Sequence, residues 1–189
     1  MPKNPVQFQK GLSEFEFRDK FGTEDQCREA LFEWRWPGGF ECPQCGGQKY
    51  SMISTRAHYQ CSRCRFQTSL ISGTIFHSTK LALRIWFAAI YHMTQAKHGI
   101  SAMELARRLG ISHNTAWKMK HKIMQVMLER DAQRKLSGRI EVERSKIVGP
   151  GMMGSNQQKN GVSFIAAVET NELRHPLRIK LSVVREYSR

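Results

Sequence analysis

The first periodic pattern of hydrophobic residues lies before residue 40 and predicts a helix. Thr23 and Gln26 have the spacing of a capping box, in which each side chain bonds the backbone N–H of the other residue. Pro-Gly-Gly at residues 37–39 ends the pattern. Between these signals, apolar side chains recur on one helix face at i, i+3, i+4 and i+7: Cys27, Ala30, Leu31 and Trp34. We therefore interpret Cys27 as a small core residue of this helix rather than as a metal ligand.

The same periodicity predicts three more helices, at residues 80–96, 101–109 and 112–128. Ser101 and Glu104 have capping-box spacing, and Gly110 permits a tight turn between the last two helices. Ser112 is suited to cap the helix that follows the turn. This arrangement predicts a helix-turn-helix bundle. The inner side of its second helix is expected to consist of Ala116, Met119, Ile123, Val126 and Met127.

Runs rich in β-branched residues predict three strands near the end of the sequence: Ile140–Val148, Val162–Glu169 and Leu177–Val184. The polar, charged residues before them predict a linker. The fold class expected from these patterns is a multi-domain α+β protein. Its predicted segments are a helical N-terminal segment at 1–39, a cysteine-rich ribbon of short strands at 40–76, the helix-turn-helix region at 77–128, the linker at 129–139 and a β-rich part at 140–189.

Four cysteines form two C-x2-C pairs separated by fifteen residues: Cys42, Cys45, Cys61 and Cys64. Two such turns brought together make a closed tetrahedral site of four sulfurs, which suits one structural zinc ion per chain. Gly46 is suited to the left-handed conformation that follows such a pair. Two disulfides, four separate buried thiols and a rubredoxin-like iron site are the alternatives. We expect the small hydrophobic layer of the ribbon to be formed by Tyr50, Met52, Ile53, Tyr59 and Phe66.

The charge of the chain indicates a polyanionic partner. The 189 residues carry a formal charge of +14, and residues 81–140 alone hold 11 Lys and Arg against 3 Asp and Glu. The longest apolar run is too short to span a bilayer, and no secretory signal is visible in the first 20 residues, so a membrane role is not expected. We therefore predict a cytoplasmic protein whose partner is double-stranded DNA, and the reducing compartment also argues against disulfides.

The second helix of the predicted helix-turn-helix carries the candidate DNA contacts. His113 and Asn114, at its start, are suited to contact bases, and Lys118 and Lys122 are suited to contact phosphates. The complete set of candidate DNA-binding residues is Ser112, His113, Asn114, Trp117, Lys118, His121 and Lys122. The alternative for the unit is an ordinary helical hairpin with a solvated basic face. Trp117 is equally suited to pack against the helix at 80–96.

Several motifs occur in an order that resembles a known family. Arg-Trp-Pro-Gly-Gly-Phe at 35–40 leads into Cys-Pro-Gln-Cys-Gly at 42–46, and Gly-Thr-Ile-Phe at 73–76, Trp86-Phe87 and Ala-Trp-Lys-Met at 116–119 follow. In this order they resemble bacterial insertion-sequence transposases that join an N-terminal zinc ribbon to a DDE-type, RNase H-like core. The resemblance covers residues 20–185. It implies that the ribbon and helices recognise terminal inverted repeats during DNA transposition, a form of DNA recombination.

The resemblance also implies a catalytic position. In this family three carboxylates hold two divalent ions, usually Mg²⁺, and the first carboxylate lies on the first core strand. Glu143 matches that position, although the family has Asp there, and Arg144 stands where a second acid is common. The extra methylene of Glu moves its carboxylate by roughly 1.5 Å, which Mg²⁺ tolerates poorly. The alternative for Glu143 is a solvent-facing strand residue.

We expect the RNase H-like part to be truncated or degenerate, because three strands are predicted where the family has five and no later acid matches a catalytic position. The chain is therefore predicted to bind DNA without Mg²⁺ and to be catalytically inactive. A homo-oligomer or an intact transposase acting in trans is a possible partner. A zinc-ribbon and helix-turn-helix regulator without enzymatic activity is the second hypothesis, and a relic that never folds is the third.

Overall fold

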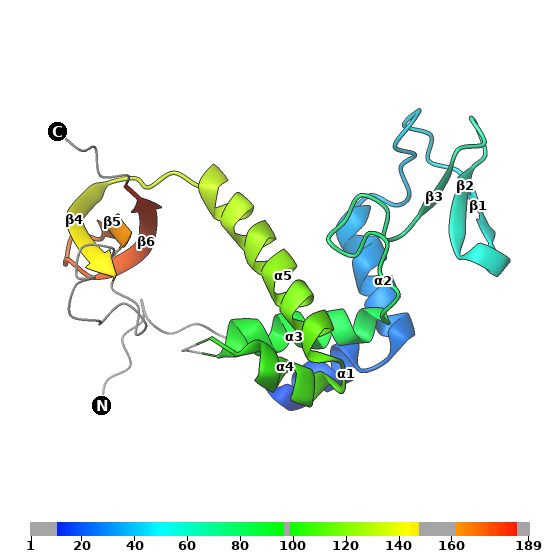
Figure 1. The fold of residues 1–189 in the computed structure, drawn as a ribbon. Helices are drawn as coiled ribbons and strands as arrows, with labels where there is room; N and C mark the ends of the chain where they lie inside the picture. Colours follow the sequence, from blue (N-terminus) through cyan, green and yellow to red (C-terminus); the bar gives the residue numbers. More distant parts are fainter. Residues whose placement is uncertain (1–10, 97–98, 148–161, 185–189) are drawn as a thin grey trace. The chain divides into compact units, whose positions relative to one another are not determined.

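A computed structural model of the chain describes residues 11–96, 99–147 and 162–184. Within these residues the chain forms two compact units, one spanning Gly11–Arg130 and one beginning at Asp131. The first unit contains five helices and a small sheet, and the second contains a separate three-stranded sheet (Figure 1). In the part of the chain that is described, no helix is both long and apolar enough to cross a membrane.

Two helices open the first unit, and only the second was predicted. Helix α1 spans Glu14–Phe21 and helix α2 spans Glu24–Arg35. The predicted capping box of α2 is present, since Thr23 and Gln26 exchange side-chain to backbone hydrogen bonds. A second capping box starts α1, formed by Ser13 and Glu16. Helix α1 has no regular apolar period, so the Ser-x-x-Glu cap was the available sequence signal for it.

The core of α2 agrees with its predicted face in three of four positions. Cys27 and Leu31 are buried, and Ala30 packs against the core, so the interpretation of Cys27 as a core residue is confirmed. Trp34 is 60 % exposed, contrary to the prediction. Its ring stacks on Phe87 of helix α3 at a centroid distance of 5.4 Å and contacts Phe21 of α1 at 6.0 Å, and the rest of the indole faces solvent.

The remaining helices are close to their predicted positions, with one difference in length. Helix α3 spans Leu83–Gln95, α4 spans Ala102–Leu109 and α5 spans His113–Gln133. The start of the segment predicted as a linker, 129–139, is therefore helical. Ala116, Met119 and Ile123 of α5 are buried as predicted, but Val126 and Met127 are exposed. The apolar period continues past Ile123, whereas the packing against other helices ends there.

The sheet of the cysteine-rich ribbon is antiparallel, in the order β1-β2-β3. Its strands are β1 at Tyr50–Ile53, β2 at His58–Cys61 and β3 at Gln67–Ser69, and a 3-10 turn at Ser54–Arg56 joins the first two. The predicted hydrophobic layer is correct in part: Tyr59 is buried, Ile53 is half-buried and Tyr50 packs on the Tyr59 ring at 5.2 Å, whereas Met52 and Phe66 are exposed. The buried aromatic residues come instead from the segment before the first cysteine. Tyr59 contacts Phe32, Trp36 and Phe40 at ring-centroid distances of 5.6, 5.4 and 6.0 Å.

The second sheet is an antiparallel meander in the order β4-β5-β6. Its strands are β4 at Arg139–Ile147, β5 at Val162–Thr170 and β6 at Pro176–Val183, each within one residue of a predicted strand at both ends. Val148, the last residue of the first predicted strand, lies outside the described residues. Every residue of β4 is exposed, so one edge of the meander is uncovered within this unit.

Candidate metal centre and nucleic-acid interface

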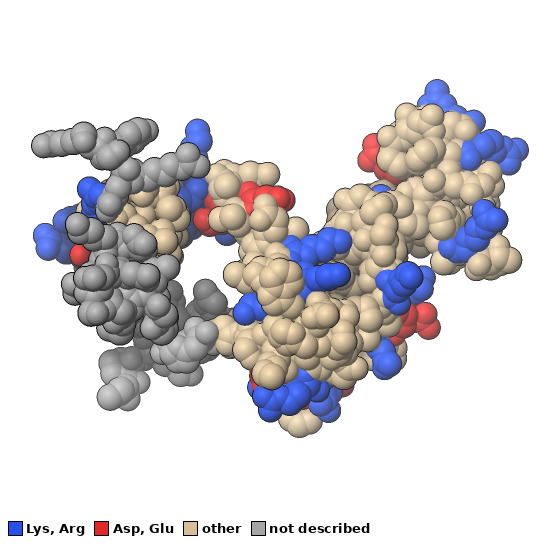
Figure 2. Space-filling view, viewed as in Figure 1, with Lys and Arg blue, Asp and Glu red and all other residues tan. Residues whose placement is uncertain are grey.

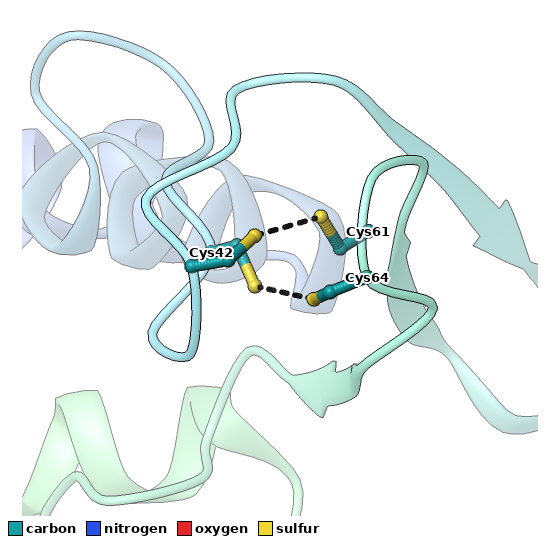
Figure 3. A group of neighbouring side chains, drawn as sticks. Cys42, Cys61 and Cys64 are labelled. Carbon is teal, nitrogen blue, oxygen red and sulfur yellow. Dashed lines mark hydrogen bonds between the residues drawn. The ribbon is translucent and has the colours of Figure 1, made fainter.

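Four cysteine sulfurs gather at one point of the ribbon. The Sγ atoms of Cys42 and Cys64 are 3.6 Å apart, as are those of Cys45 and Cys61, and all four lie within 4.8 Å of one another. Figure 3 shows the side chains of Cys61 and Cys64 pointing toward the loop that carries Cys42. Four sulfurs at about 2.3 Å from a tetrahedral zinc ion would be about 3.8 Å apart. The sulfur cage therefore has the size that zinc requires.

Two tight turns of the backbone hold the cysteines in place. In the first turn, the N–H of Gly46 donates to the carbonyl of Cys42 over 2.9 Å, and Gly46 has the predicted left-handed φ of 68°. In the second turn, the N–H of Arg65 donates to the carbonyl of Cys61 over 3.0 Å. The N–H of Ser62 donates to the carbonyl of Lys49, which ties the second turn to the segment after the first.

Gly47 also belongs to the metal centre, although the cysteine spacing does not point to it. A Cβ atom at this position would lie 3.2 Å from the Sγ of Cys61 and 3.3 Å from the Sγ of Cys45. Both distances are shorter than ordinary contacts, so a side chain would press on two of the four sulfurs. The sequence signal is the second glycine directly after Cys45-Gly46.

The pKa values of two of the four thiols are shifted in opposite directions. The backbone N–H of Cys64 lowers the pKa of Cys61 to about 6, helped by the N–H of Arg63, which donates to the same sulfur over 3.4 Å. The pKa of Cys64 is raised to about 12, because desolvation and the three neighbouring thiols outweigh the N–H of Phe66, which lowers it. Four thiolates repel one another at this distance unless a metal ion compensates their charge.

The tight turn between helices α4 and α5 has the predicted geometry. Gly110 ends α4 with a left-handed φ of 65°, and Leu105 is completely buried. The Ser101 side chain accepts the backbone N–H of Glu104, but the Glu104 carboxylate binds the Arg108 guanidinium at 2.8 Å. The predicted hydrogen bond to the Ser101 side chain is therefore present, whereas the Glu104 side chain pairs with Arg108 instead of returning to the Ser101 backbone. The hydroxyl of Ser112 accepts the backbone N–H of Thr115 over 3.3 Å, which makes it the cap of α5.

The other candidate DNA-binding residues form one exposed face of α5. They occupy two adjacent i, i+4 rows, opposite the buried row of Ala116, Met119 and Ile123. One row contains His113, Trp117 and His121, and the other contains Asn114, Lys118 and Lys122. On the side shown in Figure 2, Lys and Arg atoms lie beside the N-terminal half of α5. The sequence-predicted residues are thus brought onto one surface.

Two aromatic contacts shape this face. The rings of Trp117 and His121 are 4.1 Å apart between centroids, and Trp117 is 51 % exposed. Trp86 of α3 is buried, and the Lys122 ammonium lies 5.7 Å from its ring centroid.

Glu143 does not join an acidic cluster within the described part of the chain. It is exposed on β4, and its partner across the strand pair is Ala166. In the described ranges, the four cysteines form the only group of His, Cys, Asp and Glu residues that is close enough to hold a metal ion. In these ranges, therefore, the structure does not assemble a group of three carboxylates at Glu143.

Residues 22–67 match a family described as a transposase zinc-ribbon domain. Together with the four clustered sulfurs, this match confirms the predicted cofactor, a structural zinc ion held by Cys42, Cys45, Cys61 and Cys64. The cysteine-rich segment is thus a zinc ribbon.

The chain is also similar to an "Uncharacterized protein in transposable element ISH50" from Halobacterium salinarum, with 27 % identity over 127 residues. The alignment covers 65 % of this chain and 42 % of that relative, so the chain spans less than half of the relative's length. No solved structure matches the chain. The two similarities together support a transposase-related role.

Proposed function

We propose that the chain is a transposase-type DNA-binding protein that recognises the terminal inverted repeats of an insertion sequence. The observation that carries this proposal is that one compact unit contains both a zinc ribbon and a pair of helices with an exposed basic face. A zinc ribbon of the transposase type is followed there by a helix pair whose second helix exposes a basic and aromatic face. Both belong to the compact unit at residues 11–130.

In this proposal the helix pair is a helix-turn-helix, and α5 is its recognition helix. His113 and Asn114 lie at its start, where a recognition helix meets the base edges of the major groove. An Asn side chain is suited to the bidentate contact with adenine, which contributes about 1–3 kcal/mol of discrimination. Lys118 and Lys122 follow on the same face, where they neutralise backbone phosphates. The proposed domain limits remain 40–76 for the ribbon and 77–128 for the helices.

The described sheet at 139–147, 162–170 and 176–183 is assigned to an RNase H-like core by the resemblance alone. We propose that residues 1–189 do not cleave DNA by themselves. Two observations support this: in the described ranges Glu143 belongs to no group of three or more ligand side chains close enough to hold a metal ion, and Arg144 is adjacent in sequence. Strand cleavage by two metal ions requires several carboxylates at one point. Catalysis would then depend on an intact transposase in trans or on an oligomer.

The test is selection of binding sites from random duplex DNA with the zinc-loaded full chain. The proposal expects enrichment of a sequence that resembles insertion-sequence ends, with binding that weakens steeply as salt increases. Enrichment of promoter-like sites instead would favour the regulator hypothesis, and salt-independent binding would contradict both.

Matched variants localise the interface. Lys118→Gln and Lys122→Gln together should reduce the slope of log K against log salt concentration by about 1.8, since each phosphate contact contributes about 0.9. Lys20→Gln, an exposed lysine on α1, is the control and should leave the slope unchanged. Asn114→Ala should relax the preference for one base of the selected site while leaving the slope intact.

A nicking assay tests the absence of catalysis. The full chain should not nick supercoiled DNA with Mg²⁺ or Mn²⁺, and Glu143→Asp should not create activity, because in the described ranges no set of three carboxylates converges at this position. Nicking by the wild-type chain that is lost in Glu143→Gln would overturn this part of the proposal.

A further inference from the structure

The two faces of the β4-β5-β6 sheet differ in charge. Side chains of residues paired across antiparallel strands lie on the same face, and successive residues alternate between faces. The register therefore places Glu141 and Glu143 on one face, together with Ile179, Leu181 and Val183. The opposite face, here called the basic face, contains Arg144, Lys146, Arg178 and Lys180, and its single acid is Glu169.

Glu169 is engaged by the segment that follows α5. Its carboxylate is buried and accepts hydrogen bonds from the backbone N–H of Ser137 over 3.2 Å and from the Ser137 hydroxyl over 3.4 Å. Arg178 is its partner across the strand pair, yet no ion pair forms between them. This contact holds the residues before Ser137 against the sheet.

A pocket of about 160 Å³ lies where this segment meets β6. Four cations line it, two from each side, and Asp131 is the one acid among the lining residues. None of these four cationic side chains has an ion pair or side-chain hydrogen bond to another residue in the described ranges. The residues that line the pocket are Asp131, Arg134, Lys135, Leu136, Arg178, Ile179 and Lys180.

We propose that this pocket binds a phosphodiester group of the nucleic-acid backbone, which makes the sheet a second DNA contact surface apart from the α4–α5 helix pair. Four cations facing one carboxylate leave a strong excess of positive charge, and a guanidinium fork fits two oxygens of one phosphate. The volume holds several water molecules, which is enough for a tetrahedral phosphate. Arg144 and Lys146 continue the positive charge diagonally across the same face. The inference rests on the proposed function, because it assigns DNA as the source of the phosphate.

The experiment uses the full zinc-loaded chain and its selected duplex. Arg178→Gln should weaken binding about three- to tenfold at moderate salt and lower the salt slope by about 0.9. Arg139→Gln is the matched control, since it also removes one charge from this sheet but lies on the opposite face, beside Glu141. Arg178→Lys keeps the charge, so it should retain most of the slope, and a thermal melt of each variant verifies the fold. If Arg178→Gln and Arg139→Gln reduce DNA affinity and the salt slope equally, the proposal that this pocket binds a phosphodiester is wrong.

A second arm separates this inference from the proposed function. Titration of ¹⁵N-labelled full chain with inorganic phosphate should give saturable amide shifts at residues 134–136 and 178–180, and Arg178→Gln should abolish them. If DNA binding depends on Lys118 and Lys122 but not on Arg178, the function stands and the pocket proposal fails. If phosphate saturates the pocket while the chain binds no DNA, the pocket is a free-phosphate site and the nucleic-acid assignment fails.

Discussion

The carboxylate of Glu24 caps the first turn of a helix that starts almost 60 residues later in the chain. Its Oε1 accepts a 3.0 Å hydrogen bond from the backbone N–H of Leu83, and its Oε2 accepts one of 3.2 Å from Arg84. Helix α3 needs this partner because its own N-cap residue, Ala82, has no side-chain acceptor. The negative charge also lies at the positive end of the α3 dipole. The contact therefore fixes the start of α2 to the start of α3.

Removal of this cap should destabilise the helical unit. Glu24→Ala is expected to cost about 1–2 kcal/mol, which is the usual effect of losing a helix cap, and Glu24→Gln should cost less because the amide oxygen still accepts one bond. Chemical denaturation followed by circular dichroism measures both. Glu29→Ala, an exposed acid on the same helix, should change stability by less than about 0.5 kcal/mol. Equal losses for Glu24→Ala and Glu29→Ala would show that the interhelical cap contributes nothing.

The zinc centre should be stoichiometric and necessary for the ribbon. The purified chain should contain about one zinc per molecule, and Cys42→Ser should release it and unfold the sheet β1-β2-β3, because folding of such ribbons is coupled to metal binding. Elemental analysis and the dispersion of amide signals provide the measurements. Cys27→Ser is the control: its thiol lies outside the sulfur cluster, so the variant should keep its zinc. Retention of zinc by Cys42→Ser would contradict the assignment.

Cys27 should resist alkylation. Burial raises the pKa of its thiol to about 11, with Glu24 adding to the effect, and its Sγ–H donates to the carbonyl of Phe21 over 3.4 Å. At pH 8 about one molecule in a thousand would carry the reactive thiolate. Mass spectrometry after iodoacetamide treatment should find Cys27 unmodified in the folded chain. A chelator should expose the four ribbon cysteines first, and only a denaturant should expose Cys27. Rapid labelling of Cys27 in the native protein would show that the α2 core opens readily.

His92 should make the helical unit less stable in acid. Burial, followed by the charge of Arg108, lowers the pKa of His92, while Glu14 and Glu104 oppose the shift. Since the unfolded chain then binds the proton more readily than the folded one, this contribution to stability is complete above the unfolded value of about 6.5 and decreases as the pH falls below it. Thermal melts at about pH 7.5 and pH 5.5 should therefore differ less for His92→Gln than for the wild type. His113→Gln, at an exposed position, should retain the wild-type difference.

Short-range signals predicted the elements of this chain well. The Thr23 and Gln26 cap, the Gly110 turn and the Ser112 cap lie where the sequence places them, because each depends on hydrogen bonds between residues a few positions apart. The cysteine spacing also predicted the sulfur cluster. Two C-x2-C turns have few ways to meet, and a tetrahedral metal site selects one of them.

Burial followed the sequence less closely, because it depends on which partner is present. The apolar period of α5 continues through Val126 and Met127, but the neighbouring helices end before these residues, so both are exposed. In the ribbon, Trp36 and Phe40 cover Tyr59, and the nearer residues Met52 and Phe66 are left in solvent. Periodicity identifies which side chains share a face, but it does not say whether another element covers that face.

The sequence by itself determined the sulfur ligands, the helix caps and turns and the positions of the last three strands along the chain, because these features depend on local backbone geometry and on fixed spacing. The tertiary structure decided the rest: the Glu24 cap on α3, the exposed Trp117–His121 pair and the segregation of charge between the two faces of the β4-β5-β6 sheet. These features join residues that are distant in sequence or depend on strand register. They form only when segments that are distant in sequence pack together in one register.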